Sequence, residues 1–225
     1  MSKTNVEVVR GFIDQILNAR HLDQVLQYTS KDCWLHSPPY IGLGTWVFPT
    51  PDNRLVIQKV AKNAPATGKV QAGDELVRVS DIRRTWDTFE KLKNNPWEIG
   101  KVGETVTITV RRSGKLMDIP LVRSRIEGDD ITIEEWLQII GDNFLKNWPV
   151  YKIEIKMIVA QDDLVTVYII IEGTNSQFHA DAVWSGFSMA RVKDGKMVDW
   201  WSVDDGVGCL AQLGYQQIAP QVEAA

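Results

Sequence analysis

The sequence predicts an α+β protein, and three observations carry this prediction. Apolar residues recur at helical spacing near the N-terminus, behind Thr4 and Glu7, which have the spacing of a helix-capping box. Near the C-terminus, "AVWSGFSMARV" and "KMVDWWSV" alternate like strands and meet at Asp194-Gly195, a two-residue hairpin signal. From Trp46 onward, short strand-like runs are separated by clusters of turn formers. The middle of the chain is therefore expected to form a small unit of its own.

The other expected elements follow in chain order. After the first helix, a short second helix is expected near residues 22–28. The middle region is expected to hold strands at "LVIQKV" and "DELVRV", a helix over residues 86–92, and two strands joined at Ser113-Gly114. Thr132 and Glu135 give a second capping box, and the strands "YKIEIKMIV" and "LVTVYIIIE" then flank Asp162-Asp163. The last hundred residues thus have the pattern of a helix followed by an antiparallel meander.

Composition limits the classes of partner and cofactor. The chain has 225 residues, 44% of them hydrophobic, and a net charge of −4 from interspersed acidic and basic residues, which disfavours nucleic acid and membranes. It has no segment typical of a signal peptide or a membrane span, so a cytoplasmic location is expected. Cys33 and Cys209 lack metal or disulfide spacing and are expected to be reduced, buried thiols. No motif predicts a cofactor or a metal site.

The middle of the chain resembles a PDZ domain of the prokaryotic type. The stretches "IGLGTWV", "NAPA", "VQAGDELVRV" and "VGETVTITVRRSGK" carry this resemblance over residues 39–127. It implies a small β-barrel-like sheet with helices, and binding of protein C-terminal peptides along an edge strand. The implied peptide-binding residues are Gly42, Leu43, Gly44 and Thr45 in the carboxylate-binding loop, Trp46 at the start of an edge strand that runs to Phe48, and Phe89 on the helix. Alternatively, Gly42 and Gly44 only turn the chain into this domain.

The outer parts of the chain, residues 1–38 and 128–225, resemble the SnoaL-like polyketide cyclases of the nuclear transport factor 2-like superfamily. The resemblance rests on "CWLHSPP", "IEGTN", "ARVKDGKMVDWWSVDD" and "AQLGY". It implies a curved antiparallel sheet wrapped against helices as a cone with an apolar interior, a small-molecule ligand in that cone, and a homodimer. The PDZ-like segment would then be an insertion between two parts of one domain.

Hairpin register predicts which side chains share a face of the last two strands. A two-residue turn at Asp194-Gly195 places Trp184, Gly186 and Ser188 opposite Asp205, Val203 and Trp201, respectively. We therefore expect Trp184, Ser188 and Trp201 to line a pocket with Asp205 at its end, and Asn175 to contribute from the preceding strand. A β-bulge would invert part of this assignment.

Asp205 and His36 are the candidate catalytic residues. Asp205 occupies the position where the SnoaL-like cyclases carry an aspartate implicated in proton transfer, and His36 occupies the family's histidine position. A carboxylate in an apolar pocket becomes a usable acid or base, and a histidine can hydrogen-bond a developing enolate. The same residues have plainer explanations: Asp205 as the N-cap of a helix over "GVGCLAQLGY", and His36 as a turn residue beside Pro38 and Pro39.

Two functions from different classes are compatible with the sequence. The first is an enzyme or small-molecule-binding protein whose cone carries out cyclase- or isomerase-type proton transfer at a carbon acid. The second is a non-catalytic dimeric scaffold that presents PDZ grooves to protein partners. An epoxide hydrolase would need two carboxylates that bracket an arginine, and the predicted register places Arg191 and Asp205 on opposite faces. Whether the chain is an enzyme is left open by the sequence.

Overall fold

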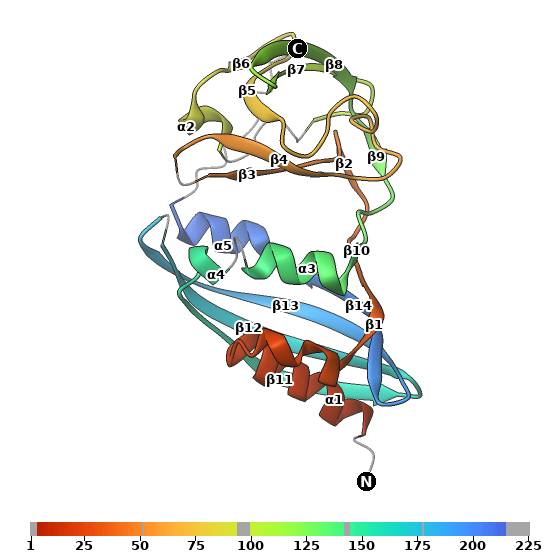
Figure 1. The fold of residues 1–225 in the computed structure, drawn as a ribbon. Coiled ribbons are helices and arrows are strands. Elements are labelled where there is room, and N and C mark those ends of the chain that lie inside the picture. Colours follow the sequence, from red (N-terminus) through yellow and green to blue (C-terminus); the bar gives the residue numbers. More distant parts are fainter. Residues whose placement is uncertain (1–3, 51, 94–99, 142–144, 177, 215–225) are drawn as a thin grey trace, which may run out of the picture. The chain divides into compact units, whose positions relative to one another are not determined.

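The computed structural model describes residues 4–50, 52–93, 100–141, 145–176 and 178–214. The chain divides into two compact units (Figure 1). The outer unit comprises Met1–Ser37 and Asp130–Ala225, and the inserted unit comprises Pro38–Asp129. Both units combine helices with β-sheet, so the chain is an α+β protein. Tyr215, the last residue of the "AQLGY" stretch, lies outside the described residues.

The N-terminal helix of the outer unit forms where the capping box predicts it. α1 (Asn5–Gly11) begins after Thr4, whose hydroxyl accepts the N–H of Glu7 while the Glu7 carboxylate accepts the N–H of Thr4. A π-helical segment, η1 (Phe12–Asn18), and a 3₁₀ segment, η2 (Leu22–Gln27), follow. The Asn18 amide exchanges two hydrogen bonds with the backbone of Ile153, at 2.9 and 2.7 Å. This pair fixes the end of η1 to the neighbouring strand.

The sheet of the outer unit is mixed rather than purely antiparallel. Its order is β10 (Ile131–Thr132), β1 (Thr29–His36), β14 (Lys196–Asp204), β13 (Ala180–Lys193), β12 (Leu164–Asn175) and β11 (Val150–Gln161). Strands β11 to β14 form the predicted antiparallel meander, and β1 adds to it in parallel beside β14. Asp194 and Gly195 form the predicted turn with φ of 50° and 70°, in the left-handed region that such hairpins require.

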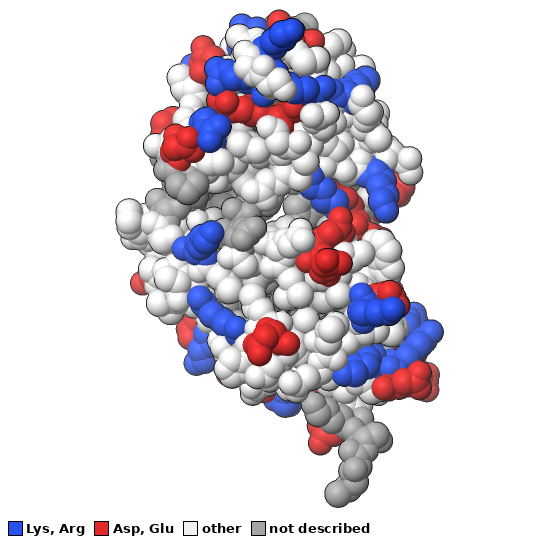
Figure 2. All heavy atoms as spheres, viewed as in Figure 1, with Lys and Arg blue, Asp and Glu red and all other residues white. Residues whose placement is uncertain are grey.

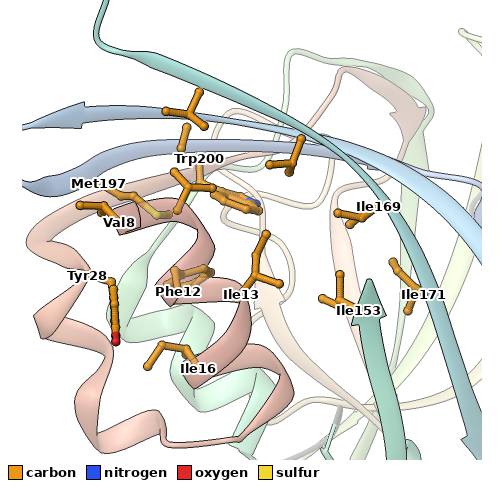
Figure 3. Packing of buried hydrophobic residues seen from close by; sticks show 14 of the residues in the cluster. Val8, Phe12, Ile13, Ile16, Tyr28, Ile153, Ile169, Ile171, Met197 and Trp200 are labelled. Carbon is orange, nitrogen blue, oxygen red and sulfur yellow. The ribbon is translucent and has the colours of Figure 1, made fainter. Parts of the chain in front are cut away.

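One face of this sheet, here called the inner face, carries the core of the outer unit. Phe12, Ile13 and Ile16 pack against Ile153, Ile169, Ile171, Met197 and Trp200 (Figure 3). α3 (Ile133–Ile139) adds Trp136, whose ring lies 5.8 Å from that of Phe12. α4 (Leu145–Asn147) precedes β11, and α5 (Gly206–Gln212) follows β14. The Gln212 amide exchanges hydrogen bonds with the backbone of Val183, so α5 lies beside the part of β13 that extends past the end of β14.

The predicted register of the last hairpin is wrong by one residue beyond Val198. Lys193 pairs with Lys196 and Val192 with Met197, but Arg191 pairs with Asp199, which leaves Val198 in a β-bulge. Ser188 consequently pairs with Ser202 instead of Trp201. The inner face of β14 therefore carries Trp200, Ser202 and Asp204, and Trp201 lies on the opposite face, here called the outer face.

The inserted unit contains two sheets. The smaller pairs β2 (Tyr40–Gly42) with β9 (Ser124–Ile126). The larger has the order β3 (Thr45–Pro49), β4 (Leu55–Val60), β5 (Glu75–Ser80), β7 (Thr105–Arg112) and β8 (Lys115–Val122), with β6 (Thr85–Trp86) pairing β5. Within the described residues this sheet stays open, which corrects the expected barrel-like shape. The predicted edge strand is β3, at one end of the order.

The helix of the inserted unit is shorter than predicted. α2 spans Phe89–Leu92, because the Thr88 hydroxyl caps it by accepting the N–H of Lys91. Trp86, expected in this helix, instead pairs with Val79 in β6. The unit has its own core, which includes Leu43, and a buried carboxylate, Asp74, that holds Arg112 through two hydrogen bonds of 2.7 and 2.6 Å. Each unit thus has a separate hydrophobic centre.

The described helices and surface add two general observations. None of the helices in the described part of the chain combines the length and hydropathy needed to cross a membrane. On the face drawn in Figure 2, acidic and basic side chains are interspersed over each unit.

The two cysteines, Cys33 and Cys209, are free thiols and buried, as predicted. Burial, and next the charge of Asp199, raises the pKa of Cys33 to about 12, so this group stays a neutral thiol near neutral pH.

Candidate functional site

Three aromatic rings meet on the inner face near the end of β14. The Trp184 ring centroid lies 5.1 Å from that of Trp148 and 6.2 Å from that of Tyr151, and the centroids of Trp148 and Tyr151 are 6.4 Å apart. Gly173 on β12 permits this arrangement, because a Cβ there would lie 2.9 Å from the Trp148 ring. We call Trp148, Tyr151 and Trp184 the aromatic cluster.

Polar groups of the inner face lie beside the aromatic cluster. The indole N–H of Trp184 donates to a carboxylate oxygen of Asp204 at 3.3 Å, and the hydroxyls of Ser188 and Ser202 are hydrogen-bonded at 3.0 Å. Ser202 and Asp204 are exposed, although Trp184 and Ser188 on the same face are buried. The core therefore fills most of the inner face but leaves its β14 end accessible.

Burial keeps two neighbouring groups of this region neutral. Burial, and next the charge of Asp204, raises the pKa of the Tyr151 hydroxyl well above its ordinary value. The pKa of the Cys209 thiol is raised by burial, and next by the charges of Asp204 and Asp205. Tyr151 thus stays a neutral phenol that can donate a hydrogen bond, close to a carboxylate that can accept a proton.

Asp205 is the N-cap of α5, one of the two roles that its sequence position allows. Its carboxylate accepts the N–H of Gly208 at 2.8 Å, and its own N–H donates to the carbonyl of Ser185 at 2.9 Å. The predicted register placed Asp205 at the end of the Trp184 face. The bulge at Val198 gives that place to Asp204.

His36 lies on the outer face. Its Nδ1 is 2.8 Å from Asp130 and its Nε2 is 2.9 Å from Asp199, and its ring stacks on that of Trp201 with centroids 4.6 Å apart. Cys33 and Leu35 of the same strand face the core, which is why the alternate residue His36 points away from it. The structure does not bring His36 to the inner face that Trp184, Ser188 and Asp204 share.

The carboxylates around His36 have a defined electrostatic effect. Burial acts to lower the pKa of His36, but the hydrogen bonds with Asp199 and Asp130, together with their charges, outweigh it and raise the pKa. The N–H of Ser37 also donates to Asp130 at 3.2 Å. The imidazolium thus joins the end of β1 to the start of the chain segment that returns from the inserted unit.

We predict that His36→Gln removes a pH-dependent part of the stability of the outer unit. Because the pKa of His36 is raised on folding, its contribution, about 1–2 kcal/mol, is complete below the ordinary histidine pKa of about 6.5 and is lost as the pH rises through the folded-state pKa. Denaturant unfolding of both proteins at several pH values above the carboxylate range measures this. The difference should shrink as the pH rises, and a constant or growing difference would contradict the assignment.

A second charged group on the outer face involves Arg191. Its guanidinium lies 2.7 Å from Asp163 and 3.5 Å from Asp199, so two carboxylates bracket an arginine. Arg191 alternates with the buried Ala190 and Val192 and therefore points away from the core. The arrangement that an epoxide hydrolase would need is thus present on the outer face and not beside the aromatic cluster.

The remaining predicted pocket residues take different positions. Trp201 is on the outer face, where it stacks on His36. Asn175 is buried at the end of β12, and its side-chain oxygen accepts the N–H of Phe178, as in a turn. Sequence reasoning missed Asp204. One signal was available: the N-cap position of Asp205, which makes Asp204 the last strand residue.

The expected carboxylate-binding loop of the inserted unit lies between β2 and β3. Leu43 is buried in the core, and its carbonyl accepts the N–H of Ala66 at 3.1 Å. The carbonyl of Gly44 accepts the N–H of Ala61 at 2.8 Å. Because a trans peptide directs its N–H opposite its C=O, the N–H groups of Gly44 and Thr45 point away from Ala61 and Ala66.

The flanks of this loop carry the other predicted peptide-binding residues. Gly42 ends β2 opposite Ser124, and Thr45 begins β3 opposite Val60. Trp46 pairs with Lys59, whose amine lies 5.2 Å from the centroid of the indole ring. Phe89 begins α2 and packs against the core of the inserted unit.

Comparison with known families decides the identity of the middle segment. The family model of the PDZ domain matches residues 39–121. These residues form a PDZ domain. No curated protein matches the chain.

Solved structures share the fold of the chain as a whole. Wild-type IdmH from Streptomyces antibioticus, whose assignment as a polyketide cyclase is itself provisional, is 15% identical over 95% of this chain and 100% of its own, with a TM-score of 0.51. A variant of IdmH with a truncated loop is 16% identical over 94% of this chain and 100% of its own, also with a TM-score of 0.51. At these identities the likeness shows the fold alone.

Proposed function

We propose that the outer unit binds a small, uncharged carbonyl compound and transfers a proton at a carbon next to the carbonyl. The observation that carries this proposal is the accessible end of the inner face, where the aromatic cluster adjoins the Asp204 carboxylate. Aromatic side chains supply apolar area for a flat ligand, and a carboxylate can act as the base for a carbon acid. The resemblance to SnoaL-like cyclases and the fold shared with IdmH favour the same class of chemistry.

The electrostatics of the site support an enolate-forming step. Tyr151 is a neutral phenol, and the hydroxyls of Ser188 and Ser202 lie on the same face, so donors are present for the oxygen on which negative charge develops. Asp204 forms no ion pair with any residue that the structure describes, so no cation offsets its negative charge. It would therefore repel a substrate that carries its own carboxylate. In this proposal the inner face and its helices form the cone expected from the resemblance. Asp205 and His36, the two groups expected from the sequence, are engaged elsewhere, because Asp205 caps α5 and His36 bonds Asp130 and Asp199 on the outer face.

Solvent exchange tests the proposed reaction. The full-length protein is incubated in deuterated water with aryl ketones, α-tetralone and β-tetralone among them, and loss of the α-proton signal is followed by NMR. We expect exchange at least tenfold faster than in buffer with an equal amount of an unrelated protein. Exchange at the buffer rate for every ketone would count against proton transfer as the function.

A second proposed activity is recognition of protein C-termini by the PDZ domain. It rests on the family match and on the position of the glycine-containing loop, which joins β2 to the edge strand β3, where a peptide with a terminal carboxylate would bind. β3 at the edge of the sheet offers its backbone to an added strand. Without any catalysis in the outer unit, this activity alone would make the protein a scaffold.

A library of fluorescent peptides with free C-termini tests peptide recognition by fluorescence polarisation. Each bound peptide is compared with its C-terminally amidated copy, which lacks the carboxylate but keeps every side chain. We expect amidation to weaken binding at least tenfold. Equal binding of both forms, or no binding across the library, would refute C-terminal recognition.

We further propose that the outer unit forms a homodimer through its outer face. Phe187, Val203 and Val183 are 59%, 62% and 51% exposed, and all three are on neighbouring strands of this face. The Phe187 ring lies 4.9 Å from that of Tyr168. A second copy of the same sheet would cover this apolar surface with a matching one, as the resemblance to the cyclases implies.

A further inference from the structure

Two adjacent carboxylates, Asp204 and Asp205, end β14, and their surroundings differ sharply. The Asp205 carboxylate is held against the first turn of α5 by the N–H of Gly208. It lies so close that a Cβ at Gly208 would be 2.1 Å from one of its oxygens. Asp205 is therefore occupied by helix capping, a role that needs its acceptor oxygens and no proton transfer.

Asp204 is positioned by inner-face residues instead. It pairs with Gly186, where a Cβ would lie 3.1 Å from that of Asp204, so glycine leaves room for the aspartate. The indole N–H of Trp184 donates to Oδ2 at 3.3 Å. Across the described residues, no side chain donates a hydrogen bond to Oδ1. One oxygen is thus fixed in place and the other can accept a proton.

The residues near Asp204 match the needs of enolate formation. Trp184 belongs to the aromatic cluster, which provides a surface for a flat ligand. The ring centroid of Tyr151 lies 6.2 Å from that of Trp184, which bonds Asp204, and burial keeps the Tyr151 hydroxyl protonated. A base and a neutral hydrogen-bond donor therefore adjoin one apolar surface.

We infer that Asp204, and not Asp205, is the catalytic carboxylate, with Trp184 as its positioning residue and Tyr151 as the donor to the enolate oxygen. This inference rests on the proposed function. In the step, the C–H bond next to the carbonyl breaks, its proton goes to Oδ1 of Asp204, and its electron pair forms the C=C bond of the enolate. Return of a proton, or a deuteron after exchange with solvent, to that carbon restores the ketone and the carboxylate.

The paired variants Asp204→Asn and Asp205→Asn test the assignment in the full-length protein. Asparagine caps helices about as well as aspartate, so Asp205→Asn keeps the cap of α5 and serves as the matched control. With α-tetralone in deuterated water, we expect Asp204→Asn to slow exchange about 100-fold or more and Asp205→Asn to change it less than about threefold. The reverse pattern, or equal losses in both variants, would overturn the inference.

Trp184→Phe tests the positioning role, because phenylalanine keeps an aromatic ring but removes the N–H donor. We expect kcat for exchange to fall about tenfold while KM for α-tetralone changes less than about threefold. A rise in KM with unchanged kcat would mean that Trp184 only binds the ketone, and it would overturn the positioning role.

Covalent labelling separates failure of this inference from failure of the proposed function. Phenyl glycidyl ether reacts with an accessible carboxylate in an apolar site. A carboxylate oxygen bonds to the terminal carbon of the epoxide, and the bond between that carbon and the epoxide oxygen breaks. The resulting alkoxide takes a proton from water. Fragmentation of the labelled peptide by mass spectrometry distinguishes Asp204 from Asp205. If no ketone exchanges, the proposed function fails, and a label on Asp204 still supports its assignment as the reactive carboxylate. A label on Asp205, or on neither, overturns that assignment.

Discussion

Replacing Gly44 by alanine is expected to destabilise the inserted unit by about 3–5 kcal/mol and to leave the outer unit folded. Gly44 has a φ of 81°, and a Cβ at this position would lie 2.2 Å from the Cβ of Ala64 and 3.3 Å from that of Ala61. The substitution therefore combines backbone strain with overpacking. Hydrogen exchange of the full-length protein, read by mass spectrometry, measures both units in one sample, because each has its own core.

Gly68→Ala is the matched control for this prediction. Gly68 has a similar φ of 73°, but no atom lies within 4 Å of the position that its Cβ would take. It should cost only the backbone strain, about 1–2 kcal/mol. Equal destabilisation by the two variants would show that the close contact with Ala64 is unimportant.

Phe187→Glu is expected to convert the proposed homodimer into a monomer. A charged side chain at the middle of the outer face would have to be buried without a partner when two sheets meet, and the contact of Phe187 with Tyr168 would be lost. We expect the dissociation constant of the dimer to rise at least about 100-fold. Sedimentation velocity at several protein concentrations measures it.

Leu116→Glu provides the control for surface charge. Leu116 is 61% exposed on β8 of the inserted unit, so the same change is made there on a strand that is not part of the outer face. It should leave the dissociation constant unchanged. A wild-type protein that sediments as a monomer at all concentrations, or dimers that persist in Phe187→Glu, would refute the proposed interface.

Local signals in the sequence predicted many of the elements. The capping boxes at Thr4 and Thr132 act through residues three positions apart, and the turn at Asp194-Gly195 needs only two residues. Because these interactions join residues close together in the chain, they can be predicted from a single sequence. The parallel pairing of β1 with β14 joins residues more than 160 positions apart, so no local pattern predicts it.

The candidate site was predicted less well, because a single residue, Val198, determines which side chains of β14 face it. The bulge at Val198 shifts the remainder of β14 by one position, which moves Trp201 to the outer face and gives the place of Asp205 to Asp204. Side chains alternate along a strand, so a one-residue shift reverses every assignment beyond it. Trp184 and Ser188 kept their predicted face, because the extra residue, Val198, belongs to β14 and leaves the alternation along β13 unbroken. His36 could not be placed, since its strand was not recognised as part of the sheet.

Binding of a small carbonyl compound to the inner face beside Trp184 can be measured directly by NMR. The nine tryptophans give separate indole N–H signals in proton–nitrogen correlation spectra. The variants Trp184→Phe and Trp201→Phe each remove one signal and so assign the signals of Trp184 and Trp201. On addition of α-tetralone, we expect the Trp184 signal to shift, because its N–H is bonded to Asp204, and the Trp201 signal to stay in place. A shift of Trp201 with Trp184 unmoved would place binding on the outer face beside His36 and would contradict the account.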